Sequence, residues 1–174
     1  MHYNVPLIPQ SASMSCWAAS MAMILEFKNE ASYDQSLLAE NFGGPSYTRQ
    51  LQSGISISDT YILRRYGFTL EAPVCYSAEG LYTLLFNNGP LWIAAAVPSG
   101  HVRVITSMDL ISGANSDNSR VYINDPWEVG MTVFRQNNRG SRYSLTFSQL
   151  MAQYEALAYA TISAPTPLTV AHLN

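Results

Sequence analysis

Charge is scarce in this 174-residue chain: Asp, Glu, Lys and Arg together make up 12% of it, against 48% hydrophobic residues. So apolar a composition excludes a disordered chain, and the absence of heptads excludes a coiled coil. The nine Lys and Arg residues are scattered and the net charge is −3, so we expect no nucleic-acid partner. No segment reaches the ~18 consecutive apolar residues of a membrane span, so we expect no membrane-spanning helix.

Cysteine is also rare. Cys16 and Cys75 are the only two in the sequence, too few for a disulfide framework, and we expect two free thiols. The first residues lack a basic stretch followed by an apolar run, so we expect no signal peptide. We expect neither a metal ion nor a cofactor.

Helical patterns come first along the chain and strand patterns second. This segregation predicts an α+β fold with a helical half and an antiparallel-sheet half. Ser32 and Gln35 have capping-box spacing, which predicts that Ser32 caps the second helix. We expect helices over 16–29, 32–42, 56–67, 77–88 and 147–155, strands over 91–97, 101–108, 120–124 and 157–162, and a hairpin of 131–134 with 142–146. Residues 1–164 are expected to form a single domain and residues 165–174 a C-terminal tail.

The segment from Gln10 to Ser20 places a cysteine at the start of an apolar helix rich in small residues. Ser15 is the expected N-cap of this helix. The thiolate is the nucleophile in thiol catalysis, and the partial positive charge of a helix N-terminus favours it at Cys16. Cys75 follows a proline and has no comparable helix start, so we expect an ordinary buried or surface thiol there.

A nucleophilic thiol needs a base and a group that orients the base. Two of the three histidines lie near the termini, which leaves His101, at the start of a predicted strand after a Pro-Ser-Gly turn. Asp125 ends the next predicted strand, and antiparallel neighbours would bring the two side chains to one rim of the sheet. Asn124 is a second candidate for the orienting group and Asp109 a weaker third.

An acyl-transfer site also needs donors for the oxyanion. The backbone N–H of Cys16 and the side-chain amide of Gln10 can supply two, each worth roughly 3 kcal/mol in the transition state. Trp127 follows Asp125 closely and is expected to shield the His–Asp contact from water; Trp17 is a further supporting candidate. Taken singly, each residue has an ordinary interpretation: a core thiol, a loop glutamine, a turn aspartate or a core aromatic.

Taken together and in this order, Gln10, Cys16-Trp17, His101 and Asp125 resemble the site of the papain-like cysteine peptidases. The resemblance spans residues 5–155 and implies a two-lobed fold with the cysteine on the central helix. It also implies a cysteine endopeptidase with a Cys-His-Asp triad and an acyl-enzyme intermediate. The stretches 5–10, 89–92, 101–106 and 121–127 look most like the compact bacterial branch, which includes injected effector proteases of plant pathogens and interbacterial toxin domains.

The chain departs from lysosomal papain relatives in residues 12–14, where they carry a glycine-cysteine pair, and in having no disulfide framework. The bacterial branch is therefore the closer analogue. It implies a secreted effector or toxin, delivered by a specialised secretion system into the cytoplasm of a target cell. The implied partners are a protein or peptide substrate and a cognate immunity or inhibitor protein.

Two alternatives remain open at the level of sequence. Papain-like folds also carry amidases and deamidases that act on peptidoglycan or other non-protein amides, because fold does not fix function. An isoelectric point near 5.5 counts mildly against a wall hydrolase. A catalytically inactive binding module is the less favoured second alternative, since all four residue types occur in order.

Overall fold

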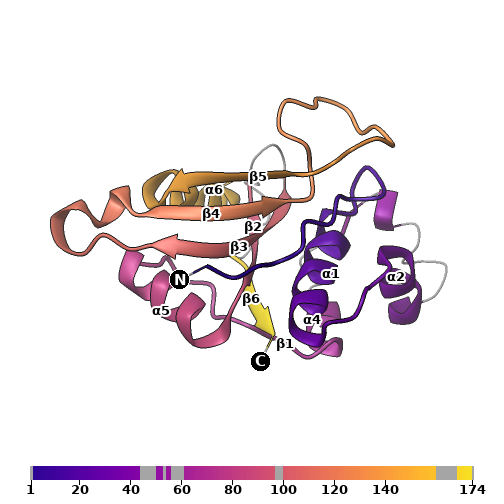
Figure 1. The fold of residues 1–174 in the computed structure, drawn as a ribbon, viewed down its shortest axis with the longest axis horizontal. Helices are drawn as coiled ribbons and strands as arrows, with labels where there is room; N and C mark the ends of the chain where they lie inside the picture. Colours follow the sequence, from indigo (N-terminus) through magenta and orange to yellow (C-terminus); the bar gives the residue numbers. More distant parts are fainter. Residues whose placement is uncertain are drawn as a thin grey trace.

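The protein consists of a group of helices packed against a six-stranded antiparallel sheet (Figure 1). Its structure is a computed structural model that describes residues 2–43, 50–52, 54–55, 61–96, 100–159 and 168–173. Within these ranges no helix is long and apolar enough to cross a membrane. The elements are α1 (Cys16–Asn29), α2 (Gln35–Gly43), α4 (Tyr61–Arg65), β1 (Phe68–Leu70), α5 (Ala78–Asn88), β2 (Leu91–Ala95), β3 (His101–Asp109), the 3₁₀-helix η2 (Gly113–Asn118), β4 (Arg120–Asp125), β5 (Ser141–Thr146), α6 (Phe147–Tyr159) and β6 (Val170–Leu173).

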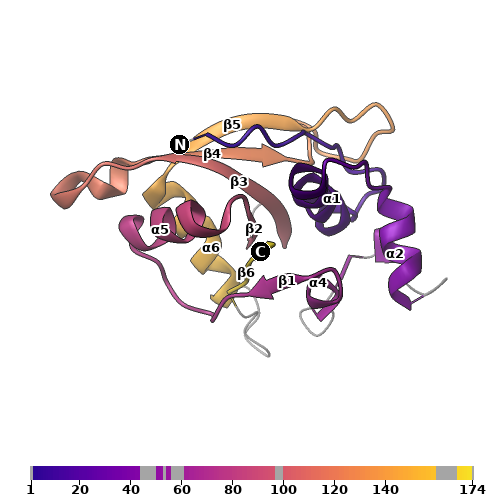
Figure 2. The same cartoon turned by 60° about the horizontal axis from the view of Figure 1, so that its bottom comes forward.

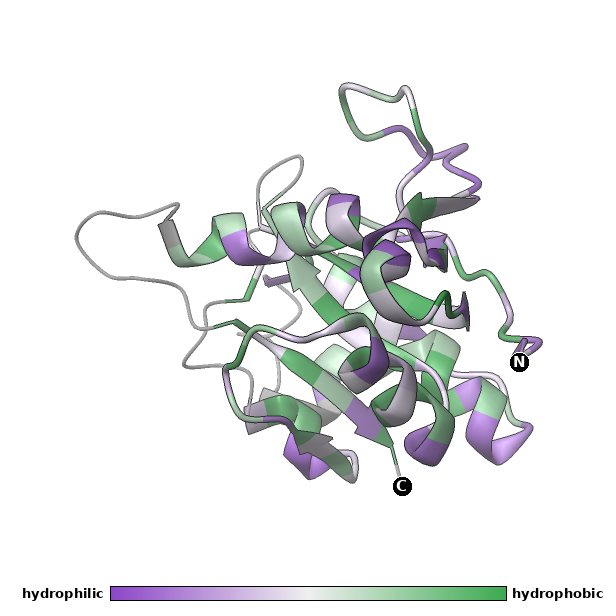
Figure 3. Cartoon of the chain, turned by 90° about the vertical axis from the view of Figure 1, so that its left-hand side faces the viewer, coloured by the Kyte–Doolittle hydropathy of each residue, from purple (hydrophilic) through white to green (hydrophobic). Residues whose placement is uncertain are grey.

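The sheet has the strand order β1-β6-β2-β3-β4-β5, and every neighbouring pair is antiparallel. Its central strands β2 and β3 are buried on both faces. Figure 3, coloured by hydropathy, shows the green of hydrophobic residues on strands in the interior of the molecule. Because successive side chains of a strand point to opposite faces, Trp92 joins the core under α1 while Leu91 and Ile93 join the core under α5 and α6. Figures 1 and 2 show α1, α2 and α4 on one side of the molecule and the sheet with α5 and α6 on the other.

Helix α1 is the central helix of the helical lobe, and its residues 16–25 are all buried. Ala18, Ala19 and Ala22 are fully buried, so small side chains let β3 approach the helix closely. The hydroxyl of Ser20 donates to the carbonyl of Val102 in β3 at 3.3 Å, which ties the two lobes together. Close packing of α1 on β3 places the start of the helix beside the start of the strand.

Two predicted helices are confirmed in full, α1 and α5, and Ser77 caps α5 by accepting the N–H of Gly80. Helix α2 begins later than predicted because Asp34 rather than Ser32 caps it. The Asp34 carboxylate accepts the N–H groups of Ser36 and Leu37. The predicted third helix is present as α4 from Tyr61; its predicted start at 56–60 lies outside the described residues.

The strands predicted over 91–97, 101–108 and 120–124 are present as β2, β3 and β4. Residues 97–99, which include most of the predicted turn, lie outside the described residues. The predicted hairpin is wrong: residues 131–134 form no strand, and β5 pairs with β4 instead. The reason is that residues 126–140 form a long loop held by side-chain hydrogen bonds rather than a strand.

The end of the chain also differs from the prediction. Residues 157–159 continue α6 instead of starting a strand, and 160–162 lie outside the described residues. The predicted tail is wrong as well, because β6 inserts between the edge strand β1 and β2. All four residues of β6 are buried, which gives this short apolar segment its place in the core.

Candidate active site

A cavity of about 210 Å³ lies where the start of α1 meets the start of β3. Cys16 is the first residue of α1 and His101 the first of β3, and each is 7% exposed. The structure thus brings the predicted nucleophile and the predicted base to one site from opposite lobes. The cavity is lined by Gln10, Ser13, Met14, Cys16, Gly100, His101, Trp127 and Thr132.

The loop before Cys16 leaves the start of α1 without a side-chain cap. Ser15 precedes the helix as predicted, but its hydroxyl makes no capping hydrogen bond. Instead its oxygen accepts the N–H of Ala12 at 3.0 Å and contacts Gln35 Oε1 at 3.1 Å. The prediction that Ser15 caps the helix is therefore wrong, because its hydroxyl holds the preceding loop instead. An uncapped N-terminus keeps its partial positive charge directed at the cavity.

His101 and Asp125 form a short, buried pair at the rim of the sheet. His101 Nε2 lies 2.6 Å from Asp125 Oδ1, and both side chains are 8% exposed. They meet because β3 and β4 run antiparallel, with Val104 opposite Asn124. Since Nε2 faces the carboxylate, Nδ1 is the ring nitrogen left to face the thiol of Cys16.

The environment of His101 favours the imidazolium. Burial alone would lower its pKa, but hydrogen bonds with Asp125 and Cys16, and the charges of both, outweigh burial and raise the pKa to about 9. The partners Asp125 and Cys16 therefore stabilise the protonated form of the ring. The imidazole is therefore arranged to hold a proton at neutral pH between two acidic partners.

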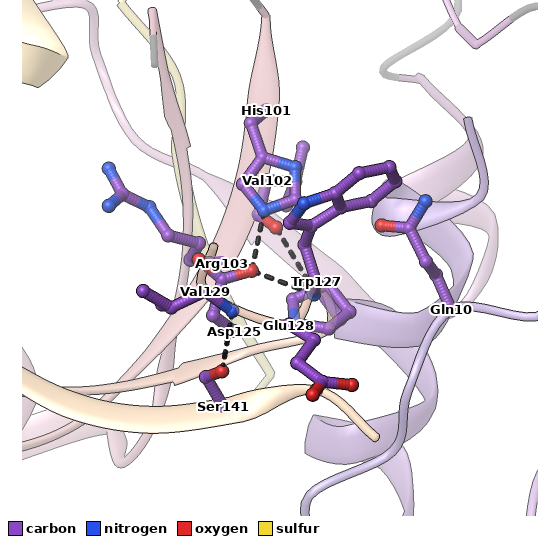
Figure 4. Close-up of polar contacts among 12 residues, drawn as sticks. Gln10, His101, Val102, Arg103, Asp125, Trp127, Glu128, Val129 and Ser141 are labelled. Atoms are coloured by element: carbon purple, nitrogen blue, oxygen red, sulfur yellow. Dashed lines mark hydrogen bonds and ion pairs between the residues drawn. The ribbon is translucent and has the colours of Figure 1, made fainter. Parts of the chain in front are cut away.

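Both oxygens of the Asp125 carboxylate have hydrogen-bond partners. Besides His101, Oδ1 accepts the backbone N–H of Trp127 at 2.8 Å (Figure 4). Oδ2 accepts the hydroxyl of Tyr143 at 2.7 Å. Gly140 packs against its backbone, where a Cβ would lie 2.8 Å from the Asp125 carbonyl oxygen. The direction of the carboxylate is thus fixed from three sides.

Gln10 lies in the cavity as predicted, but its amide is engaged. Nε2 donates to the carbonyls of Ala12 at 2.8 Å and Ser13 at 2.9 Å. Two facing carbonyls fix which end of the amide is nitrogen. Oε1 is buried, and within the described part of the chain no donor reaches it. To bind an oxyanion, the amide would exchange one neutral carbonyl for a charged acceptor, a stronger hydrogen bond.

Asn138 joins the Gln10 segment to the segment after Asp125, a role the sequence reasoning missed. Its Nδ2 donates to the carbonyls of Gln10 and Pro126, at 3.2 and 2.8 Å. Its Oδ1 accepts the N–H groups of Glu128 and Gly140. All hydrogen-bonding positions of this buried amide are used, so Asn138 fixes both walls of the cavity. A lone asparagine in a polar loop gives no signal of this role.

The remaining candidates lie elsewhere or act differently. Asn124 does not contact His101; its amide donates to the carbonyls of Val5 and Pro6 and anchors the N-terminal segment. Asp109 ends β3, at the opposite end from His101. Trp17 is buried in the core and does not line the cavity.

Trp127 lines the cavity, and its indole N–H donates to the carbonyl of Met131 at 2.8 Å. In the view of Figure 4 its ring lies between His101 and Gln10. Cys75 is an exposed free thiol, and no disulfide joins it to Cys16. Across the described ranges, no group of three or more His, Cys, Asp or Glu side chains could hold a metal ion.

Comparisons with known proteins identify a family and a similar fold. The sequence profile of the family described as "Papain-like cysteine protease AvrRpt2" matches residues 1–139. Among solved structures, the chain is similar to a double glycine motif protease from an AMS/PCAT transporter in complex with the leader peptide. That similarity has a TM-score of 0.55 at 18% sequence identity and covers 99% of this chain and 94% of the other. No curated protein sequence matches the chain.

Proposed function

Because the chain belongs to the AvrRpt2 family of papain-like cysteine proteases and is a cysteine peptidase, we propose that Cys16, His101 and Asp125 are its catalytic triad. The observation that carries the proposal is the position of His101. Its Nε2 is held by Asp125 at 2.6 Å, and its ring lies in the same cavity as the thiol. The membership favours a peptidase over the amidase or deamidase alternative.

Cleavage then proceeds in two steps. The sulfur of Cys16 attacks the carbonyl carbon of the peptide bond, and the imidazolium of His101 gives its proton to the leaving nitrogen as the C–N bond breaks. The product is a thioester on Cys16 and a free amine. In the second step His101 takes a proton from water, whose oxygen attacks the thioester carbon. The S–C bond breaks, the acid product leaves, and the thiolate–imidazolium pair is restored.

The backbone N–H of Cys16 and the amide of Gln10 stabilise the oxyanion in both steps. The uncapped start of α1 supports this role, since a backbone donor there faces no competing cap. Gln10 turns one of its two N–H groups from a loop carbonyl to the oxyanion as negative charge develops. Preorganised donors of this kind act in a site where burial excludes water.

The substrate is a protein or peptide, and we propose that it belongs to a target cell into which the chain is delivered as an effector or toxin. A family defined by the protease AvrRpt2 supports delivery into host cells. The structural neighbour was solved in complex with a leader peptide, which supports a polypeptide as the ligand of this fold. Control by a cognate immunity protein would follow from such a role.

Mapping of new protein N-termini tests the proposal. Wild type and Cys16→Ala are incubated with bacterial and plant lysates, and mass spectrometry identifies termini that appear with wild type alone. Cys75→Ala is the matched control, because it removes the exposed thiol and should cleave like wild type. Identical sets of termini with wild type and Cys16→Ala would contradict the proposal, and release of fragments from purified peptidoglycan would favour the amidase alternative.

The delivered role has a separate test. Wild type and Cys16→Ala are expressed inside candidate target cells, and growth or cell death is scored. We expect harm from the wild type alone. Equal growth with both forms in every cell type would contradict a toxin or effector role while leaving the peptidase activity in place.

A further inference from the structure

Arg103 is an unusual residue for its position, because it lies inside strand β3, where all residues from His101 to Met108 are buried. The side chain is itself buried, at 3% exposure. Burying a charge without a counter-charge is costly. Nevertheless, within the described part of the chain no carboxylate lies at ion-pair distance from its guanidinium. A charged side chain between two valines, Val102 and Val104, is the sequence signal that could have marked it.

The guanidinium is bound by two neutral groups. Nη1 donates to the hydroxyl of Tyr143 at 2.9 Å, and Nη2 donates to Oε1 of Gln153 at 2.7 Å. The Tyr143 hydroxyl in turn donates to Asp125 Oδ2 at 2.7 Å. One hydroxyl therefore separates the buried cation from the buried carboxylate. In the view of Figure 4, Arg103 and Gln10 lie on opposite sides of the His101–Asp125 pair.

Starting from the proposed triad, we propose that Arg103 and Tyr143 are positioning residues for Asp125. The Tyr143 hydroxyl accepts a hydrogen bond from the Arg103 cation and donates one to Oδ2, so it holds the positive charge close to the carboxylate. It also fixes the carboxylate so that Oδ1 points at His101. The charges then alternate along the line from Arg103 to Cys16: cation, carboxylate, imidazolium, thiolate.

We call the hydrogen-bonded series Arg103–Tyr143–Asp125 the relay. It matters when His101 loses its proton. During leaving-group protonation the imidazole becomes neutral, and Asp125 would be left as a buried anion without a counter-charge. Arg103 supplies that counter-charge through Tyr143, so the carboxylate stays ionised and in place. Its presence also makes the imidazolium easier to deprotonate, because a positive charge behind the carboxylate opposes the one on the ring.

The hydroxyl of Tyr143 keeps its proton across the working range. The pKa of Tyr143 is raised to about 12. Burial is the main cause and the charge of Asp125 adds to it, whereas the charge of Arg103 lowers the pKa. The groups that face the hydroxyl are Arg103 from β3 and Asp125 from β4, while the neutral amide of Gln153 from α6 accepts from the other terminal nitrogen of the guanidinium. His101 faces Asp125 from β4 and Cys16 from α1. Tyr143 therefore remains a donor to the carboxylate.

Titration of His101 by NMR of ¹³C-labelled histidine tests the relay directly. The chain has three histidines, and a His101→Ala variant assigns the signal. Removing the cation in Arg103→Met should raise the His101 midpoint by ~0.5–1 pH unit, a three- to tenfold change in proton affinity. Tyr143→Phe should raise it in the same direction by less. Arg103→Lys, which keeps the charge, should stay near wild type.

The matched controls come from β4, the strand between those that carry Arg103 and Tyr143. Tyr122→Phe removes another Tyr–Asp hydrogen bond of 2.7 Å, to Asp109, and Arg120→Met removes an exposed arginine of β4. Both should leave the His101 midpoint unchanged. A merely structural role for Arg103 and Tyr143 predicts the opposite sign, since a loosened carboxylate would lower the midpoint. An unchanged or lowered midpoint in folded Tyr143→Phe overturns the inference.

The titration distinguishes this inference from the proposed function. If the wild type cleaves proteins but the midpoints do not rise, the relay alone is refuted. If the midpoints rise as expected but the wild type cleaves nothing, the peptidase assignment fails and the relay stands. With a substrate found by terminus mapping, Tyr143→Phe should lower kcat about tenfold and leave KM unchanged, because its hydroxyl contacts no substrate.

Discussion

Replacing Asp125 with asparagine tests the electrostatics of the site. Asn keeps an oxygen that can face His101 Nε2 but removes the charge. The rise of the His101 pKa from 6.5 to about 9 corresponds to roughly 3 kcal/mol in favour of the imidazolium. Burial lowers the His101 pKa, whereas Asp125 and Cys16 both raise it, so Asp125 accounts for only part of the rise. Without the Asp125 charge we expect the midpoint to fall by ~1–2 pH units.

The consequence at pH 8 is large enough to measure. A midpoint near 9 leaves about nine tenths of His101 protonated, whereas a midpoint near 7.5 leaves about a quarter. The assay is the same ¹³C-histidine titration, with the alkaline limb of kcat/KM as a second readout once a substrate is known. The sign follows from a raised pKa: the protonated, active form exists below the midpoint and disappears as pH rises through it.

A matched control lies at the other end of β3. Asp109→Asn removes a carboxylate that lies 3.4 Å from His2 rather than beside His101, so it should leave the His101 midpoint unchanged. A wild-type His101 midpoint near 6.5, or an unchanged midpoint in folded Asp125→Asn, would refute the reasoning.

Three further predictions concern the walls of the cavity. Gln10→Ala should lower kcat about a hundredfold with little change in KM, as for loss of an oxyanion donor; an equal loss in KM would show that the side chain binds substrate instead. Gly140→Ala should destabilise the fold by roughly 2–4 kcal/mol in urea unfolding, because its φ is +65° and a Cβ would meet the Asp125 carbonyl at 2.8 Å. Gly113→Ala, with φ +82° and open space around the Cβ, should cost only about 1 kcal/mol, and equal losses would contradict the steric argument. Asn138→Ala should cost roughly 3 kcal/mol because it leaves buried partners unpaired, and a melting temperature equal to wild type would contradict its bridging role.

The sequence predicts well the elements that carry the candidate site, for local reasons. A small-residue helix that starts at Cys16 is encoded within fifteen residues, and α1 has the predicted bounds. The meeting of His101 and Asp125 needs only that two consecutive strands pair antiparallel, the commonest arrangement for neighbours in the chain. The resemblance to papain-like peptidases adds the two-lobed fold, which the structure has.

The failures of prediction involve long-range contacts. Strand β6 pairs with β2 and β1, about eighty and one hundred residues earlier in the chain, and four residues carry too little pattern to reveal it. The loop of 126–140 has no periodicity, so the bridging role of Asn138 depends on a partner, Gln10, at the far end of the sequence. Tyr143 lies on a correctly predicted strand, but its hydrogen bond to Asp125 depends on the pairing of β5 with β4 rather than with 131–134.

The most direct test of the central claim is the rate at which iodoacetamide labels each cysteine at pH 6, read by peptide mass spectrometry. Cys75 is the internal standard: it is exposed, yet a hydrogen bond with Glu155 raises its pKa and keeps it a thiol. We predict rapid labelling of Cys16, slow labelling of Cys75, and loss of the Cys16 reaction in His101→Ala. Faster labelling of Cys75, or Cys16 labelling that is unaffected by His101→Ala, would contradict a thiolate–imidazolium pair at this site.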